Sequence, residues 1–204
     1  RVATLAWNTQ AHVETWYAVM GMGAVCLTLN PRLTASQLAA MAIKAEVRVL
    51  VVSADLAPLA ARIAELAPGV ERLLVIDGAV DEKITAPDVR ELEPLLNAAD
   101  ASAIEWGGFA ETAPSGLCFT SGTTGAPKGV TYTHRSSYLH TLRLLQADVL
   151  AITARDSVLS VVPMFHANAW GLPFAVPAVG AKLVLQGRYN DGASLAFLIN
   201  AESV

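Results

Sequence analysis

Short runs rich in Val and Leu alternate with helical patterns along this 204-residue chain, and this alternation is the feature that most limits its fold. Between the runs, apolar residues recur at the three- and four-residue spacing of a buried helix face. Strands of this kind, joined by helices, form parallel β-α-β units whose sheet is covered on both faces. We therefore predict an α/β fold. The predicted strands include 1–7, 24–29, 48–53, 72–77, the apolar run before residue 121, and the runs that begin near residues 129, 157 and 181.

Local signals place the ends of several helices. Thr34 followed by Gln37 predicts a capping box at a helix start. Asp55 is predicted to cap the next helix, with Leu59, Ile63 and Leu66 as its buried stripe. Further helices are predicted at 88–99, at 133–150, after Trp170 and after Asp191.

Composition excludes some classes of protein. The net charge is -4 and Lys and Arg do not cluster, so the chain lacks the basic face that nucleic-acid binding requires. No apolar run reaches the roughly 18 residues that span a bilayer, and we expect a cytoplasmic protein without a transmembrane segment. Hydrophobic residues make up 53%, which indicates one part of a larger core. Cys26 and Cys118 are expected to be inert buried thiols, and His12 a structural histidine.

The stretch FTSGTTGAPKGV (119–130) concentrates Gly, Ser and Thr at the end of a predicted strand. Such a segment presents unhindered backbone N–H groups and hydroxyls to phosphate oxygens, and Lys128 adds a positive charge beside them. The same residues also have the chemistry of a polar hairpin turn, which is the structural alternative. It is not a Walker A loop, because Gly129 stands where that motif has Ser or Thr.

Three stretches carry a resemblance to a known family. TSGTTGAPKGV resembles the phosphate-binding signature of the adenylate-forming superfamily, and VVPMFHANAWGLPF (161–174) resembles its next core motif in fatty acyl-CoA ligases. MGMGAVCLTLNPRLT is similar to the same ligases. The resemblance covers nearly the whole chain and implies that residues 1–204 are part of the large N-terminal, AMP-binding domain.

The resemblance also implies roles for individual residues. Lys128 would neutralise charge as pyrophosphate departs, His166 would lie near the reacting carboxylate and the route of the thiol, and Trp170 resembles an aromatic gate on an acyl tunnel. His166 as a core histidine and Trp170 as a core aromatic remain the structural alternatives. The residues implied to wrap the outer phosphates of ATP are Thr120, Ser121, Gly122, Thr123, Thr124 and Gly125.

The implied reaction joins a fatty acid to coenzyme A through an acyl-adenylate, with ATP and Mg²⁺. The family motifs that hold the ribose and the metal, and the mobile C-terminal domain, do not occur in these 204 residues, so we expect the chain alone to be inactive. Alternatives are a ligase for short, sulfur-containing or aromatic acids, and a non-catalytic nucleotide- or acyl-binding module. The chain as part of a homo-oligomeric assembly is a further alternative, and peripheral membrane contact is another. The sequence does not indicate the length of the acyl chain.

Overall fold

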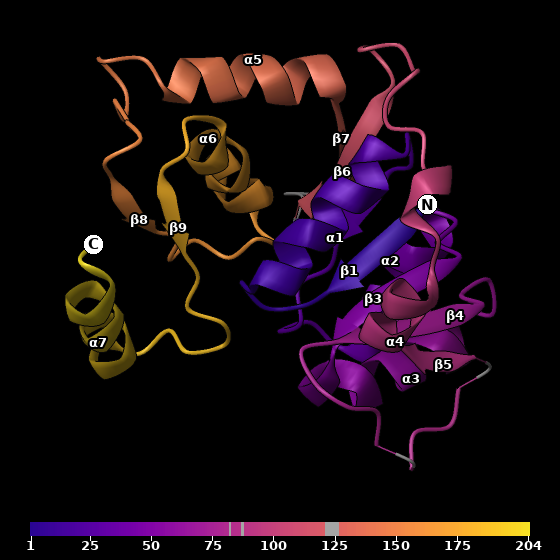
Figure 1. Ribbon diagram of the computed structural model, residues 1–204. Coiled ribbons are helices and arrows are strands. Elements are labelled where there is room, and N and C mark those ends of the chain that lie inside the picture. The colour runs from indigo at the N-terminus through magenta and orange to yellow at the C-terminus, as the bar shows by residue number, and fades with distance from the viewer. Residues whose placement is uncertain (82, 87, 121–126) are drawn as a thin grey trace.

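A computed structural model describes residues 1–81, 83–86, 88–120 and 127–204. Within these residues a seven-stranded sheet has the order β5-β4-β3-β1-β2-β6-β7, and β8 and β9 form a separate parallel pair (Figure 1). The strands are β1 (Val2–Leu5), β2 (Cys26–Thr28), β3 (Val49–Ser53), β4 (Arg72–Ile76), β5 (Val89–Glu91), β6 (Pro114–Thr120), β7 (Lys128–Thr133), β8 (Ser157–Leu159) and β9 (Lys182–Val184).

Helices connect most of these strands. They are α1 (Gln10–Gly21), α2 (Ala35–Lys44), α3 (Ala57–Leu66), α4 (Leu92–Ala98), α5 (His134–Leu144), α6 (Leu172–Ala178) and α7 (Gly192–Glu202). Neighbouring strands from β5 to β6 run parallel, as the alternating pattern predicted. Strand β7 is the exception, because it returns from β6 as an antiparallel hairpin. None of the helices described is long and apolar enough to cross a membrane.

The main core fills the space between the sheet and the helices α2 and α3. Leu5, Leu27, Leu38 and Leu50 lie in it with almost no exposed surface. The capping box of α2 is present, because Thr34 Oγ1 accepts from Gln37 N while the Gln37 side chain accepts from Thr34 N. Cys26 and Cys118 are free and buried, as predicted.

Three local predictions were wrong. Asp55 does not cap α3, which begins at Ala57 without a side-chain cap; the Asp55 carboxylate accepts instead from Trp7 Nε1 at 3.1 Å. In the predicted α3 stripe Ile63 is buried and Leu59 packs partly buried against the core, but Leu66 is 43% exposed, and the other buried residues of α3 are alanines. Finally, the segment predicted as a helix at 88–99 begins with β5, so its helix is shorter.

The chain after residue 133 lies beside α1 rather than beneath the main sheet. Figure 1 shows α6, β8 and β9 on one side of α1 and strands β3 to β5 on the other. We call residues 1–133 the sheet unit and residues 134–204 the distal unit. Trp16 and Met20 of α1 pack with Met164 and Ala169 of the distal unit in a second, smaller core cluster.

Candidate functional site

Strands β6 and β7 form the base of the predicted phosphate-binding hairpin. β6 ends at Thr120, β7 begins at Lys128, and the two residues face each other in antiparallel register. Thr120 Oγ1 donates to the Lys128 carbonyl at 3.4 Å. Lys128 therefore stands at the carboxyl end of β6, the edge at which open α/β sheets bind ligands. The remaining predicted phosphate-binding residues lie outside the described residues, namely Ser121, Gly122, Thr123, Thr124 and Gly125.

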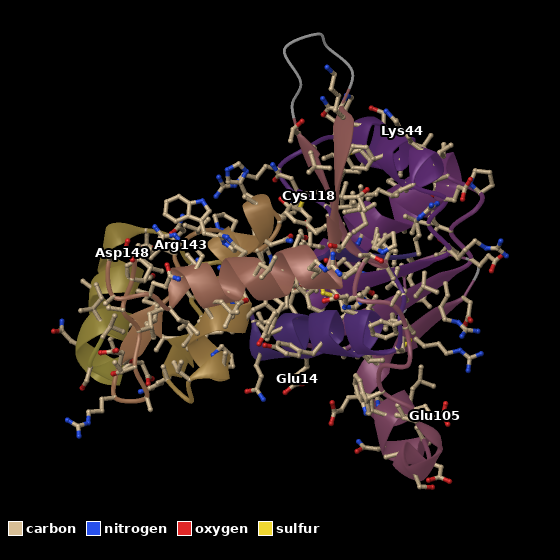
Figure 2. The ribbon with its side chains drawn as sticks, turned by 90° about the horizontal axis from the view of Figure 1, so that it is seen from above. Glu14, Lys44, Glu105, Cys118, Arg143 and Asp148 are labelled. Atoms are coloured by element: carbon tan, nitrogen blue, oxygen red, sulfur yellow. The ribbon has the colours of Figure 1, made fainter. Side chains whose placement is uncertain are left out.

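A second cation lies at the same hairpin and was missed by the sequence analysis. Lys44, the last residue of α2, donates from Nζ to the Pro127 carbonyl at 3.1 Å. Figure 2 shows Lys44 on the helix beside the hairpin. A lysine in the last helical turn is ordinary because it offsets the helix dipole, so the sequence carried no signal that it contacts the hairpin.

His166 and Trp170 bracket a tight turn between β8 and α6. Its backbone has φ values of 45, 52, 47 and 55° at residues 167 to 170, and 78° at Gly171. The middle of the turn is buried, with Ala169 at 0% exposure, whereas the Trp170 side chain is 62% exposed. Trp170 is therefore not a core aromatic within the described residues. His166 is exposed as well, so it is not part of a core formed by the described residues.

The backbone after Trp170 lies close to helix α5. His140 Nε2 lies 3.0 Å from the Trp170 carbonyl oxygen, to which it donates when this nitrogen is protonated. Gly171 makes this approach feasible, because a Cβ at that position would lie 2.7 Å from the His140 ring. The sequence analysis missed His140.

Strand β6 also contacts the buried side of the turn. Cys118 Sγ donates to Asn168 Oδ1 at 3.0 Å. Cys118 lies two residues before Thr120, so both side chains project from the same face of the strand. Through β6 the structure thus connects the Lys128 hairpin with the turn that follows His166.

Asn8 holds the segment that precedes the turn. Its side-chain amide donates to the carbonyls of Ser160 and Val162 at 2.9 and 3.0 Å, and its Oδ1 accepts from Met164 N at 2.8 Å. Asn8 Nδ2 also lies 3.4 Å from Gln186 Oε1. Because Asn8 follows β1, these bonds place the distal unit over the carboxyl edge of the sheet.

His12 has the structural role that was predicted. It is completely buried, with Nδ1 2.8 Å from the Trp7 carbonyl oxygen and Nε2 2.8 Å from Thr4 Oγ1. Trp16 Nε1 donates to Nε2 at 3.0 Å, so Nδ1 carries the proton and donates to Trp7. Burial lowers the pKa of His12 to about 4, and the ring is neutral at physiological pH.

A cavity of about 570 Å³ lies between α1, α5 and α6. Its polar lining includes Ser115, His134, Ser137 and Thr141, and desolvation lowers the pKa of the His134 imidazole. Neither His166 nor Trp170 lines the cavity, and its link to the turn is α6, which begins at Leu172 directly after the turn. The cavity has the volume of a small-molecule pocket. The apolar walls include Tyr17, Met20, Trp106, Leu142, Leu145 and Phe174.

Comparison with known proteins gives a family match over the whole chain. The model of the AMP-binding enzyme family matches residues 1–204. The chain is 44% identical over 205 residues to the medium-chain-fatty-acid–CoA ligase of Ectopseudomonas oleovorans, and covers 37% of that protein. It is 43% identical over 204 residues to the long-chain-fatty-acid–CoA ligase of Thermus thermophilus, covering 36% of it. A 3-methylmercaptopropionyl-CoA ligase from Ruegeria lacuscaerulensis is 40% identical over 205 residues, with 38% of its length covered.

Solved structures show the same architecture. The inhibitor-bound N-terminal domain of FACL13 from Mycobacterium tuberculosis superposes with a TM-score of 0.83 at 26% identity; the match covers 100% of this chain and 48% of the other. A benzoate CoA ligase from Burkholderia xenovorans has a TM-score of 0.80 at 22% identity, covering 98% of this chain and 37% of that one, which shows the fold alone.

Proposed function

The chain belongs to the AMP-binding enzyme family, and we propose that it is part of the N-terminal domain of an ATP-dependent fatty acid–CoA ligase. The chain spans about 37% of the length of its curated relatives, so the activity is proposed for a longer enzyme. The family match over residues 1–204, together with the identity to medium- and long-chain ligases, carries the proposal.

The proposed reaction has two steps. A carboxylate oxygen of the fatty acid attacks the α-phosphorus of ATP, and the bond between the α-phosphorus and the α,β-bridging oxygen breaks to release pyrophosphate. The thiolate of coenzyme A then attacks the acyl carbon of the acyl-adenylate and releases AMP. Both steps depend on positioning and on stabilising charge that develops at the transferred group.

The described hairpin supplies part of that stabilisation. Lys128, the first residue of β7, would neutralise the outer phosphates as pyrophosphate leaves, with Thr120 opposite it at the end of β6. Ser121, Gly122, Thr123, Thr124 and Gly125 are proposed to wrap the same phosphates through their N–H groups. Lys44 adds a second positive charge near the hairpin.

The turn and the cavity are proposed to bind the acid. His166 would contact the carboxylate end, and Trp170 would stand at the entrance to the acyl site. The cavity of about 570 Å³ behind α5 and α6 offers an apolar volume for the acyl chain. A long chain gains about 0.8 kcal/mol for each methylene that it buries, so such a cavity favours aliphatic acids.

Magnesium enters the proposal as part of the substrate MgATP. Among the described residues no group of three or more His, Cys, Asp and Glu side chains is arranged to hold a metal ion. Mg²⁺ in nucleotide sites is held largely by substrate phosphates and water with one or two carboxylates, so its protein ligands are expected elsewhere in the enzyme.

A second candidate function is activation of a short sulfur-containing acid. The 40% identity to a 3-methylmercaptopropionyl-CoA ligase is the observation that favours it. Both candidates use the same chemistry and differ only in the acid, which one assay can separate.

The deciding experiment is acid-dependent exchange of labelled pyrophosphate into ATP. The enzyme, extended to the length of its relatives, is assayed with saturated acids from acetate to palmitate and with 3-methylmercaptopropionate. A maximum at a medium or long chain supports the proposal, and a maximum at 3-methylmercaptopropionate supports the second candidate. Absence of exchange with every acid, in folded protein, would contradict both and favour a binding module.

The role of Lys128 has its own test. In the longer enzyme Lys128→Ala should weaken MgATP by about tenfold or more and leave AMP nearly unchanged, because a hydrogen bond to a charged group contributes roughly 1.5 to 3 kcal/mol. Lys182→Ala, which removes an exposed lysine paired with Glu202 on the distal unit, is the matched control. Equal weakening of AMP and ATP would refute the assignment.

Further expectations concern the chain itself. Residues 1–204 alone should form no acyl-CoA, because the ribose-binding and C-terminal motifs of the family are missing from them. A cytoplasmic location, peripheral membrane contact and self-association remain predictions. Purified chain that produces acyl-CoA without the longer enzyme would overturn the first of these.

A further inference from the structure

The turn at residues 167–170 has an unfavourable backbone that its own sequence does not explain. Four consecutive non-glycine residues have positive φ, between 45 and 55°. For an L-residue this region is strained, because Cβ comes close to the following carbonyl oxygen, and Asn is among the least affected residues. Three of the four are Ala167, Ala169 and Trp170, which have no side-chain group to compensate. Contacts from outside must therefore stabilise the turn.

Asn168 provides the polar part of those contacts. It is 8% exposed, and its Oδ1 accepts from the thiol of Cys118 at 3.0 Å. The thiol has only one proton, so the hydroxyl of Thr28, 3.2 Å from Sγ, must donate to the sulfur. The result is a short chain of hydrogen bonds from β2 through β6 to the centre of the turn.

Cys118 is suited to remain a donor. It is 5% exposed, and burial raises the pKa of its thiol, so the proton stays on the sulfur. The other buried cysteine, Cys26 on the adjacent strand β2, packs in the apolar cluster of Trp16 and Met20. The two thiols therefore differ in surroundings, and only Cys118 bonds to the turn.

On the premise of the proposed function, we propose that Asn168 is a positioning residue that fixes Trp170 and His166 for the acid, and that Cys118 couples this turn to the phosphate hairpin. Asn168 acts through the backbone of the turn, without contact to the reacting atoms. The same strand that ends at Thr120 thereby aligns the acid-binding turn with the place where ATP is bound.

The first test separates two contributions of Asn168: the hydrogen bond that its side chain accepts, and the ease with which Asn adopts positive φ. Asn168→Ala and Asn168→Gly both remove the acceptor, but glycine adopts positive φ without strain. In the longer enzyme both variants should raise KM for the acid by about three- to tenfold, the equivalent of one hydrogen bond, and leave KM for MgATP within about twofold. Normal acid kinetics in Asn168→Gly would overturn the proposal, because the backbone alone would then suffice.

The second test is a double-mutant cycle. Cys118→Ala should reproduce the rise in KM for the acid, and adding it to Asn168→Ala should raise KM little further, because both remove one bond. Cys118→Ser retains a donor and should behave like the wild type. The controls Cys26→Ala and Cys26→Ser change packing near Ala169 but leave the hydrogen bond of the turn intact, and they should raise KM for the acid less than Cys118→Ala does. Additive effects of the Cys118 and Asn168 variants would overturn the coupling.

A third measurement does not depend on enzyme activity. The fluorescence of Trp170, obtained as the difference between proteins with and without Trp170→Phe, should show anisotropy decay at the rate of the whole molecule. Asn168→Ala should add a fast component, and Cys26→Ala should not. If the wild type activates no acid but the fast component appears, the proposed function fails and the positioning role stands. Absence of the fast component would overturn the positioning role.

Discussion

The sheet unit and the distal unit are stabilised in different ways. In the sheet unit, β3 has four of five residues buried. In the distal unit, none of the residues of α7 and none of the three residues of β8 is buried. The sheet unit has a core of its own, whereas the distal unit depends on contacts with its neighbour. Residues 134–204 should therefore unfold locally before residues 1–133.

Two kinds of contact connect the units. Apolar packing joins Trp16 to Phe174, whose rings stack with centroids 5.9 Å apart. The polar contact is the side chain of Asn8, which is 3% exposed and bonds to three backbone groups of the distal unit. The hydrophobic effect is not directional, so apolar packing alone does not fix a position. The directional hydrogen bonds of Asn8 fix the position of the segment that leads to His166.

Replacement of Asn8 should have the largest effect on how the distal unit is held to the sheet unit. Asn8→Ala removes three buried bonds and leaves the Met164 N–H without its acceptor, which we expect to cost about 4 kcal/mol in the free energy of unfolding. Hydrogen exchange should accelerate in β8 and β9 far more than in β1 and β3. The measurement is amide exchange by mass spectrometry alongside denaturant unfolding.

Asn8→Asp is the matched variant for this prediction. Aspartate keeps an oxygen that accepts from Met164 N. In place of the amide group that donates to Ser160 and Val162, it puts a second oxygen against their carbonyl oxygens. It should therefore also loosen the distal unit. Exchange that rises equally in both units would mean that they unfold together and that the distinction between them is wrong.

The second prediction concerns how low pH lowers the stability of the sheet unit. His12 has a pKa of about 4 in the folded chain and an ordinary value of 6.5, so below pH 6.5 the unfolded chain binds a proton that the folded chain does not. The contribution of His12 to the free energy of unfolding is complete above pH 6.5 and is lost as the pH falls toward about 4. At roughly 1.4 kcal/mol per pKa unit, the loss reaches about 3 kcal/mol.

The measurement is unfolding free energy against pH for the wild type and His12→Gln. The difference between them should decrease as pH falls through this window, because glutamine does not titrate. A parallel pair of curves would show that His12 does not contribute to acid sensitivity. Since Trp16 bonds to His12 and packs on Phe174, acid should also weaken the attachment of the distal unit.

Local chemistry predicted much of the fold. The capping box predicted at Thr34 is present, and the helices predicted near residue 133 and after Asp191 begin at His134 and Gly192. In the structure Thr133 and Asp191 cap these helices as well, because a short polar side chain satisfies N–H groups within three residues. Strand β5 was missed because its three residues, VRE, have no apolar run, and only pairing with β4 makes them a strand. Asp55 is a residue type that often caps helices, but its carboxylate accepts from Trp7 Nε1, which is distant in sequence.

The candidate site was only partly predictable for the same reason. The motifs pointed to Lys128 and His166, but not to the residues that position them. The Cys118 to Asn168 bond spans 50 residues, His140 to Trp170 spans 30, and Asn8 to Met164 spans 156. Nor does ANAW predict a left-handed turn, since alanine and tryptophan disfavour positive φ.

The smallest expected effect belongs to the ion pair between the units. Arg188 Nη1 lies 3.3 Å from Asp55 Oδ2, with the side chains 53% and 37% exposed. Solvent screens such pairs, so Arg188→Ala should change the unfolding free energy little and leave exchange in β9 nearly unchanged. Arg62→Ala, which breaks an exposed pair with Glu65 inside α3, is the control and should have a similar effect. If Arg188→Ala instead accelerates exchange throughout the distal unit, the surface charge pair contributes to docking, and Asn8 is not the dominant polar contact.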